Sequence, residues 1–326
     1  MSDAPLIEIK NLRTYFHTPA GVLRAVEDVS FQVNRGETLG IVGESGCGKS
    51  VTCQSIMRLV QTPPGKYEGG EIIFDGHDIL KMNKKQVLEL RGGRIAMIFQ
   101  EPMVALNPAY TIGNQLTEAM RLHHIVPKNQ AYARALELLN QVRIPNAEKI
   151  LRSYPFMLSG GMRQRVMIAM ALSCKPDLLI ADEPTTALDV TIQAQILNLM
   201  NQLKKEMGSS IIFITHDLGV ISEIADRTMV MYAGKVCEAA ATKEIIFNPL
   251  HPYTQGLIAS KPSGLTTEGN RLKTIPGNVP SLLNKPSGCP FHPRCPHMKD
   301  ICTKEFPSTV EAKPGHTVAC WLYTGE

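Results

Sequence analysis

The feature that most constrains the fold of this chain is a glycine-rich motif at residues 43–50. The motif, Gly43-Glu44-Ser45-Gly46-Cys47-Gly48-Lys49-Ser50, fits G-x-x-x-x-G-K-[ST] at every fixed position. The apolar residues 38–42 before it predict a buried strand, and residues 51–60 after it have apolar residues at helical spacing. Strand, loop and helix in this order predict a phosphate-binding loop, because glycines let successive N–H groups point at phosphate oxygens beside a helix N-terminus.

Two side chains of the motif carry chemistry of their own. We expect Lys49 to reach the β- and γ-phosphates of a nucleotide and the Ser50 hydroxyl to ligate Mg²⁺. A glycine-rich turn that binds nothing is the alternative, and the complete motif with both flanks favours the phosphate site. The motif alone leaves open which class of nucleoside triphosphatase it serves.

Length and composition bound the remaining possibilities. The 326 residues predict two domains, one of them small. A net charge of +4, a pI near 8.6 and a mean hydropathy of −0.05 are those of an ordinary globular protein, and the lack of a dense Lys/Arg run argues against nucleic acid as a partner. No apolar run approaches the length of a membrane span, and the N-terminal residues do not resemble a signal peptide, so we expect a cytosolic protein with reduced thiols.

Strands are expected at residues 6–9, 29–33, 71–74 and 95–99, with a turn at residues 18–21. The aromatic residues Tyr15 and Phe16 lie on the first connection, where either ring could stack on an adenine or simply pack in the core. Gln100 ends the strand at 95–99. A polar residue at the carboxyl edge of an α/β sheet faces the crevice where ligands bind, so Gln100 could reach a metal or an attacking water.

Residues from about 103 to 175 predict a helical insertion, with helices at 115–125, 130–142 and 161–173. The third helix begins at Leu158-Ser159-Gly160-Gly161-Met162, where Ser159 is a good N-cap and the glycines leave backbone amides open to an anion. A helix cap without a ligand is the other interpretation of this segment.

A second group of polar residues follows buried strands. The apolar segment 178–183 ends in Asp182 and Glu183, which suit water-mediated Mg²⁺ binding and activation of the water that attacks a γ-phosphate. Asp189 precedes a helix expected to reach about residue 207. Residues 235–238 are expected to form the last strand of the core. His216 follows an apolar strand at 211–215, where a contact to the γ-phosphate is a better interpretation than a core histidine.

Together these residues resemble the ATP-binding cassette (ABC) family over residues 6 to about 240. The matching motifs, in the family's order, are Walker A at 43–50, the Q-loop Gln100, the signature at 158–162, Walker B at 178–183, the D-loop Asp189 and the H-loop His216. The resemblance implies an α/β fold: a P-loop NTPase nucleotide-binding domain with a mixed sheet core and a helical insertion. It also implies ATP and Mg²⁺ as ligands, and ATP hydrolysis as the activity.

The resemblance further implies a role for each matched residue. Phe16 corresponds to the aromatic that stacks on adenine, with Tyr15 as the alternative, and Glu183, His216 and Gln100 form the catalytic set, while Mg²⁺ is held by Ser50, Gln100 and Asp182. The family's signature usually ends in Gln where this chain has Met162, which predicts two unequal ATP sites. The implied ATP contacts are Gly43, Glu44, Ser45, Gly46, Cys47, Gly48, Lys49, Ser50, Val51 and Asp182, completed by Ser159, Gly160, Gly161 and Asp189.

The C-terminal residues resemble a narrower group. Segments 251–257, 275–280 and 288–295 are similar to the C-terminal extension of ATPase subunits from oligopeptide and dipeptide importers. This resemblance implies an ABC domain at 1–245 and an extension at 246–326, on a subunit held peripherally at the cytoplasmic face of the cell (inner) membrane. Its expected partners are a second, different ATPase subunit in a heterodimer, two transmembrane permease subunits and an extracytoplasmic peptide-binding protein.

Other functions stay open beside this one. An importer for nickel or glutathione would carry the same ATPase motifs, because the permeases and the external binding protein choose the substrate. A soluble ABC protein that acts on ribosomes or DNA is less well supported, since this chain has one Walker A motif and no heptads. An exporter ATPase is disfavoured by the C-terminal resemblance.

Four of the eight cysteines gather near the C-terminus. Cys289, Cys295, Cys302 and Cys320 are spaced C-x₅-C-x₆-C-x₁₇-C in a segment rich in Pro and Gly, where a metal would order the backbone. Zinc is one candidate, but the C-x₂₋₄-C pairs typical of zinc ribbons are missing. A four-iron four-sulfur cluster suits four separated thiolates, and the resemblance to importer subunits implies such a cluster. His292, His297 and His316 are possible substitutes for one thiolate.

Overall fold

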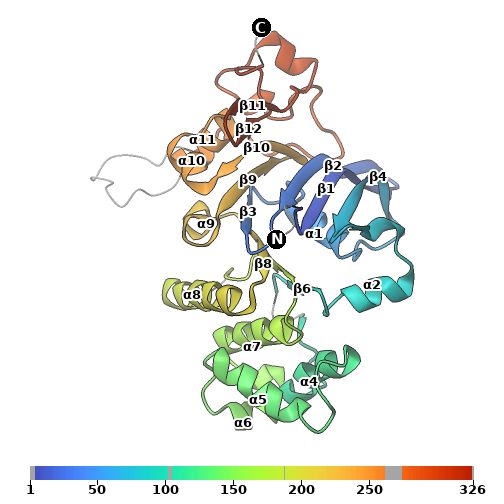
Figure 1. Cartoon of the computed structure of the whole chain (residues 1–326). Coiled ribbons are helices and arrows are strands. Elements are labelled where there is room, and N and C mark those ends of the chain that lie inside the picture. The colour runs from blue at the N-terminus through green and yellow to red at the C-terminus, as the bar shows by residue number, and fades with distance from the viewer. Residues whose placement is uncertain (1–3, 102–104, 187, 261–273, 325–326) are drawn as a thin grey trace. The chain divides into compact units, whose positions relative to one another are not determined.

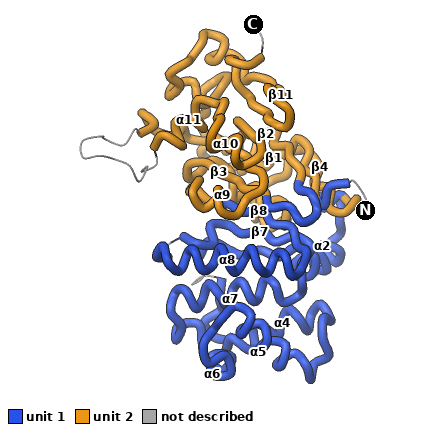
Figure 2. Tube along the Cα trace, turned by 60° about the vertical axis from the view of Figure 1, so that its left-hand side comes forward, with its two compact units in different colours: residues 1–6, 33–38, 78–214 blue, residues 7–32, 39–77, 215–326 orange. Residues whose placement is uncertain are grey.

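The computed structural model describes residues 4–101, 105–186, 188–260 and 274–324. The chain divides into two compact units, which Figure 2 distinguishes by colour. Unit 1 contains residues 1–6, 33–38 and 78–214, and unit 2 contains residues 7–32, 39–77 and 215–326. The units alternate along the sequence, so the domain boundary expected between residues 245 and 246 stays a prediction.

Unit 1 combines three parallel strands with a group of helices (Figure 1). Strand β7 pairs with β6 on one side, from Ile95 opposite Leu178, and with β8 on the other, from Leu178 opposite Ser210. All residues of β7 and β8 are buried, as expected for parallel strands covered on both faces. Its elements are η1 (Ile79–Lys81), α2 (Lys84–Leu90), β6 (Ile95–Ile98), α4 (Ile112–Leu122), α5 (Ala131–Gln141), α6 (Ala147–Leu151), η2 (Pro155–Met157), α7 (Gly160–Leu172), β7 (Leu178–Asp182), α8 (Val190–Met207) and β8 (Ser210–Thr215).

The expected helical insertion is confirmed. Helices α4, α5 and α7 match the three predicted helices to within three residues at either end, and α4 packs against α5, α6 and α7. Between β6 and β7 the described residues form no strand. The short helices α2 and α6 were not predicted from the sequence. Helix α8 begins at its N-cap Asp189, whose side chain accepts from the Ile192 amide at 2.9 Å, and ends at Gly208 with φ 68°.

Unit 2 contains two sheets. The first has the strand order β2-β1-β4-β5, and β1 runs antiparallel to β4 with Ile7 opposite Phe74 and Phe16 opposite Gly65. These strands are longer than the sequence patterns predicted, because β1 and β2 continue almost to the turn between them. The elements are β1 (Ile7–Thr18), β2 (Gly21–Val33), β3 (Thr38–Val42), α1 (Lys49–Ile56), β4 (Gly65–Phe74), β5 (His77–Asp78), α9 (Leu218–Ile224), β9 (Arg227–Tyr232), β10 (Lys235–Ala241), α10 (Thr242–Phe247), α11 (Pro252–Ala259), η3 (His292–Arg294), η4 (Asp300–Thr303), β11 (Val310–Lys313) and β12 (His316–Val318).

The second sheet of unit 2 corrects one expectation. Strand β3 is parallel to β9, β9 is antiparallel to β10, and β10 had been expected to be the last strand of the core. The sheet instead continues into the C-terminal segment, which comprises the described residues 246–260 and 274–324. There β12 pairs with β10 and β11 pairs with β12, both antiparallel. Two added strands of three and four residues are too short to produce a clear alternation in the sequence.

A cluster of aromatic side chains joins the C-terminal segment to β9. The rings of Tyr232 and Tyr253 lie 4.6 Å apart between centroids, and Phe291 lies 5.3 Å from each. All three side chains are buried. These contacts fix α11 and the turn before η3 against β9.

Two further observations concern the whole described chain. None of its described helices is long and apolar enough to cross a membrane. All eight cysteines are free thiols.

Candidate functional site

The glycine-rich loop joins a buried strand to a helix, as predicted. Strand β3 is buried along its whole length and α1 follows the loop directly. Gly43 and Gly48 have φ values of 156° and 103°. A Cβ atom on Gly43 would collide with the Met231 carbonyl, and one on Gly48 would collide with the Ala25 carbonyl. The loop can follow this path only with glycine at both positions.

Lys49 holds the loop from inside. Its side chain is buried, and Nζ donates to the carbonyl oxygens of Gly43 at 2.7 Å and Glu44 at 3.1 Å. Nζ also lies 3.8 Å from Sγ of the buried Cys47. Ser50, half-buried, occupies the first turn of α1. The loop therefore leads into the N-terminus of a helix, where backbone amides and the positive end of the helix dipole suit phosphate oxygens.

A second cluster lies in unit 1 beyond the carboxyl ends of β6 and β7. Gln100 donates from Nε2 to Oε2 of Glu183 at 3.3 Å, so the structure brings together two of the predicted residues. Thr186, which was not among the predicted residues, donates to the same oxygen at 2.9 Å. The only sequence feature that points to Thr186 is its position three residues after Glu183. Glu183 has φ 47°, and such a conformation is uncommon for a residue with a side chain and clusters at functional sites.

The flanking predicted residues keep their expected places along the strands. Asp182 is the last residue of β7 and is only 4% exposed, whereas Glu183 is half-buried. The Glu183 amide donates to the Ile214 carbonyl of β8 at 3.0 Å, which continues the pairing of the two strands. His216 follows the end of β8 and is exposed.

The signature segment forms the N-terminus of α7. The Ser159 hydroxyl is the N-cap and accepts from the Met162 amide at 3.4 Å. A Cβ on Gly160 would meet nothing within 4 Å, so this glycine faces open space. Gly161 lies against Ile192 in the first turn of α8. The helices capped by Ser159 and Asp189 thus start side by side in unit 1.

The two candidate aromatic residues have different surroundings. The Arg24 guanidinium lies 5.8 Å from the centroid of the Tyr15 ring, and burial raises the pKa of the Tyr15 hydroxyl. The Phe16 ring lies next to Gly65 on the paired strand β4. Both side chains are half-buried, so the assignment of the adenine contact to Phe16 or Tyr15 stays a prediction.

Glu44 of the glycine-rich loop is bound by the C-terminal segment, a contact that no sequence pattern predicts. Arg294 donates from its two terminal nitrogens to the two carboxylate oxygens of Glu44, at 2.7 and 3.1 Å. The Glu44 amide donates to the Tyr253 hydroxyl at 2.8 Å. Burial lowers the pKa of Arg294, but the hydrogen bonds to Glu44 and Tyr232 outweigh it and the net shift is upward.

The four C-terminal cysteines line one small cavity. Cys289, Cys295, Cys302 and Cys320 share it with His292 and His297 among others, and its volume is about 20 Å³. Burial raises the pKa of Cys289 to about 12, with a further rise from the neighbouring Cys302. Within the described ranges, no three His, Cys, Asp or Glu side chains are placed to hold a single metal ion.

His316 is not at this cavity, which corrects one expectation. Its Nε2 lies 2.7 Å from Oε1 of Glu238, and both side chains are buried. The Glu238 carboxylate also accepts from the amides of Leu250 at 2.7 Å and His251 at 2.9 Å. His316 therefore ties β12 to β10, because a buried carboxylate needs hydrogen-bond donors.

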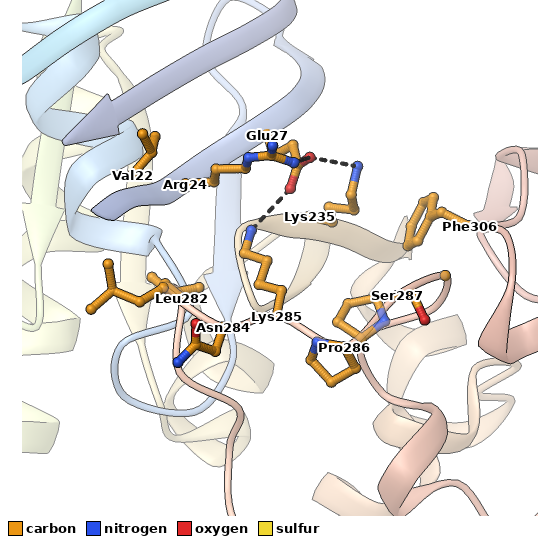
Figure 3. Close-up of a pocket in the computed structure, with 13 residues that line it drawn as sticks. Val22, Arg24, Glu27, Lys235, Leu282, Asn284, Lys285, Pro286, Ser287 and Phe306 are labelled. Atoms are coloured by element: carbon orange, nitrogen blue, oxygen red, sulfur yellow. Dashed lines mark hydrogen bonds and ion pairs between the residues drawn. The ribbon is translucent and has the colours of Figure 1, made fainter. Parts of the chain in front are cut away.

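A larger cavity lies between β2, β10 and residues 282–290, with a volume of about 650 Å³ (Figure 3). Lys285 donates to Glu27 at 3.0 Å, and Arg24 and Lys235 lie 3.5 and 4.0 Å from the same carboxylate. Figure 3 shows Glu27 between the two lysines. These contacts form a second connection between the C-terminal segment and the N-terminal strands.

Comparisons with known proteins identify the family. The family described as "ABC transporter" matches residues 26–186, and "Oligopeptide/dipeptide transporter, C-terminal region" matches residues 237–302. The oligopeptide transport ATP-binding protein AppD of Bacillus subtilis (strain 168) is 51% identical over 321 residues, which are 98% of each chain. The dipeptide transport ATP-binding protein DppD of the same organism is 49% identical over 97% of this chain and 94% of its own length. The chain belongs to the ABC transporter family.

This ABC ATPase also has solved structural relatives. The dimeric ATP-binding cassette MJ0796, in a post-hydrolysis state bound to ADP and Pi, has a TM-score of 0.65 and 26% identity and covers 72% of this chain and 98% of its own. The predicted P-loop fold of an ABC ATPase, with its mixed sheet and helices, is thereby confirmed. ATP hydrolysis is the activity of the family, and its transport members work with transmembrane permease subunits.

Proposed function

We propose that this chain is the ATP-hydrolysing subunit of a bacterial importer of dipeptides or oligopeptides. The observation that carries this proposal is similarity along nearly the whole chain, C-terminal region included, to relatives whose names specify oligopeptide or dipeptide transport. Nickel and glutathione are the alternative substrates. The permeases and the external binding protein would select among them, while this chain would supply the free energy of ATP hydrolysis.

The P-loop in unit 2 would bind the ATP phosphates. The amides of the loop and of the first turn of α1 are suited to the phosphate oxygens, and Lys49 supplies a positive charge for the β- and γ-phosphates. Phe16, or alternatively Tyr15, would stack on the adenine. Ser50, Asp182 and Gln100 are the candidate Mg²⁺ ligands, and the ion would neutralise charge on the phosphates.

The cluster in unit 1 would carry out hydrolysis. Glu183 would accept a proton from the attacking water, and its hydrogen bonds to Gln100 and Thr186 limit the rotation of the carboxylate. His216 would contact the γ-phosphate. The exposed N-terminus of α7, with Ser159, Gly160 and Gly161, would complete the ATP site of a second subunit, and Asp189 would lie at that junction.

We further propose a peripheral subunit at the cytoplasmic face of the membrane that pairs with a different ATPase subunit. Met162, where the family usually has Gln, supports two unequal ATP sites and therefore a heterodimer. Two permease subunits and an extracytoplasmic peptide-binding protein would complete the importer. In this division residues 1–245 serve ATP binding and residues 246–326 form the extension.

The cysteine cavity supports one more part of the proposal, a four-iron four-sulfur cluster. Four thiols that face one cavity match the usual ligand set of such a cluster, and Cys289 and Cys302 are buried beside the half-buried Cys295 and Cys320. Once bound, the cluster would join residues that lie far apart in the sequence. Zinc held by the same thiolates is the alternative, and His292 or His297 could replace one of them. Zinc binding would require these side chains to move closer together, because no three of them surround a single ion in the described ranges.

The substrate is tested in the complete importer. The chain is reconstituted in lipid vesicles with a second ATPase subunit, both permeases and the binding protein, and ATP hydrolysis is measured with dipeptides, pentapeptides, glutathione or Ni²⁺ outside. We expect stimulation by peptides, and none when Lys49→Ala replaces the wild-type chain. Stimulation by Ni²⁺ or glutathione alone would refute a peptide importer.

A further inference from the structure

One residue outside every nucleotide-binding motif is attached to the P-loop. The Arg294 side chain is 5% exposed and forms a two-pronged ion pair with Glu44, 250 residues away in the sequence. The same guanidinium donates to the carbonyl of Pro276 at 2.9 Å and to the Tyr232 hydroxyl at 3.2 Å. Because the planar guanidinium is held on several sides, its position is fixed relative to the C-terminal segment.

Glu44 is in turn held by hydrogen bonds at its side chain, its backbone amide and its backbone carbonyl. Its side chain accepts from Arg294, its amide donates to the Tyr253 hydroxyl, and its carbonyl accepts from Lys49 Nζ at 3.1 Å. The Cys47 amide also donates to this carbonyl, at 3.3 Å. The P-loop conformation therefore depends on donors and acceptors that residues 253 and 294 supply from outside the loop.

The turn that carries Arg294 also belongs to the wall of the cysteine cavity. In η3 the His292 amide donates to the Cys289 carbonyl at 2.9 Å, and the Cys295 amide donates to the His292 carbonyl at 3.2 Å. Arg294 is thus placed between two cavity cysteines in one hydrogen-bonded turn. A change in the separation of Cys289 and Cys295 would move the guanidinium and, with it, Glu44.

We propose that Arg294 is a positioning residue for ATP binding, and that η3 makes the affinity of the P-loop for ATP depend on the state of the four-cysteine cavity. Arg294 acts through Glu44 and does not contact the nucleotide. The second part rests on the proposed occupation of the cavity by a cluster or zinc. The first part requires only the contacts described above.

The first experiment measures the Kd of the full-length chain for ATP with Mg²⁺, together with its unfolding temperature. Arg294→Gln should weaken ATP binding about tenfold, the loss expected for one hydrogen bond to a charged group. Arg294→Lys, which keeps the charge but not the fork, should recover part of the affinity. Glu44→Gln should resemble Arg294→Gln, and the double variant should be no weaker than either single variant, because all three remove the same pair.

Lys285→Gln is the matched control. Lys285 also joins the C-terminal segment to the N-terminal part of unit 2 (Figure 3), but its ion pair is with Glu27 of β2 and not with a P-loop residue. The Lys285→Gln variant should have a lower unfolding temperature and an unchanged Kd for ATP. Equal effects of Arg294→Gln and Lys285→Gln on the Kd would reduce Arg294 to a structural role. Wild-type affinity in Lys49→Ala would instead overturn the ATP site itself.

The second experiment tests the cavity. In protein purified without oxygen, Cys295→Ser should weaken ATP binding about fivefold, the lower end of coupling between two sites. The same substitution in the Arg294→Gln background should have no further effect, because the connection is already broken. An unchanged Kd when Cys295→Ser is made in the otherwise wild-type chain would refute a connection through Arg294. An equal loss of affinity with and without Arg294→Gln would refute it as well.

Discussion

Gln100 and Glu183 share a hydrogen bond of 3.3 Å, although 83 residues separate them in the sequence. The bond forms because β6 and β7 are parallel neighbours, so the residues that follow each strand emerge at the same edge. Thr186 binds the same carboxylate oxygen and gives Glu183 a second fixed partner. The carboxylate of the expected catalytic base is therefore oriented by two side chains of unit 1.

Glu183→Gln should preserve ATP binding and lower the single-turnover hydrolysis rate by a factor of about 10² to 10⁴, the usual contribution of a general base. Thr186→Val, which removes one hydrogen bond but keeps the carboxylate, should cost about tenfold or less. Both rates are measured in the reconstituted complex. Near-wild-type turnover in Glu183→Gln would transfer the role of base to another residue, with His216 the first candidate.

The isolated chain should be a slow or inactive ATPase, because Met162 replaces the usual Gln in the signature and a different subunit is expected to complete its ATP site. Affinity purification of the tagged chain from detergent-solubilised membranes should recover two permeases and a second ATPase subunit. A fully active transporter that contains only copies of this ATPase would contradict the heterodimer.

The cysteine cavity should bind iron and sulfide. Protein purified without oxygen is assayed for iron, acid-labile sulfide and zinc, and each of Cys289, Cys295, Cys302 and Cys320 is replaced by Ser in turn. Every one of these variants should lose iron, while the control Cys174→Ser, a buried thiol of unit 1 that does not line the cavity, should retain it. A colourless protein with stoichiometric zinc and no iron would show that the cavity holds zinc and not an iron–sulfur cluster.

Cys47 should react slowly with thiol reagents despite its place in the P-loop. Burial raises the pKa of its thiol above the ordinary value of 9.0, so the reactive thiolate stays scarce below that pH and grows only as pH rises through the shifted pKa. Alkylation by N-ethylmaleimide at pH 8, followed by mass spectrometry, should leave Cys47 unmodified in the folded chain and modify it after unfolding in urea. Rapid modification of the folded protein would contradict this.

The Glu238 carboxylate should contribute strongly to folding. Glu238→Gln places an amide NH₂ group against donors that now bind carboxylate oxygens, and it removes the charge beside His316. Breaking such a buried pair should lower the free energy of unfolding by about 3 kcal/mol. Urea unfolding is compared with that of Glu206→Gln, an exposed glutamate bonded to Gln202, which should change little. Equal midpoints for the two variants would disprove the role.

The features that could be predicted from the sequence are local. The P-loop, the N-cap Ser159, the helix after Asp189, and the buried strands β7 and β8 are each encoded within a few consecutive residues, and the structure reproduces them within about a turn. Helix α2 was missed although Asn83 and Gln86 form a capping box at its start, which is a recognisable local signal.

The features that were missed depend on contacts between distant residues. Nothing near Arg294 in the sequence indicates that its partner is Glu44, and nothing near His316 indicates Glu238. Such pairs are determined by how the C-terminal segment packs on β9 and β10, and packing of this kind has no periodic signature. The cysteine spacing predicted a shared site but not its position one turn away from the P-loop contact.

The pairing of β12 with β10 has a practical consequence for protein engineering. A fragment that stopped at residue 245 would keep every ATP-binding motif, yet it would leave β10 as a bare sheet edge with unpaired amides and carbonyls. It would also strip the buried Glu238 of the donors from Leu250, His251 and His316. Open edges of this kind associate with one another, so shortened forms of the protein should aggregate. Any domain graft that borrows this ATPase must therefore carry its sequence through residue 318.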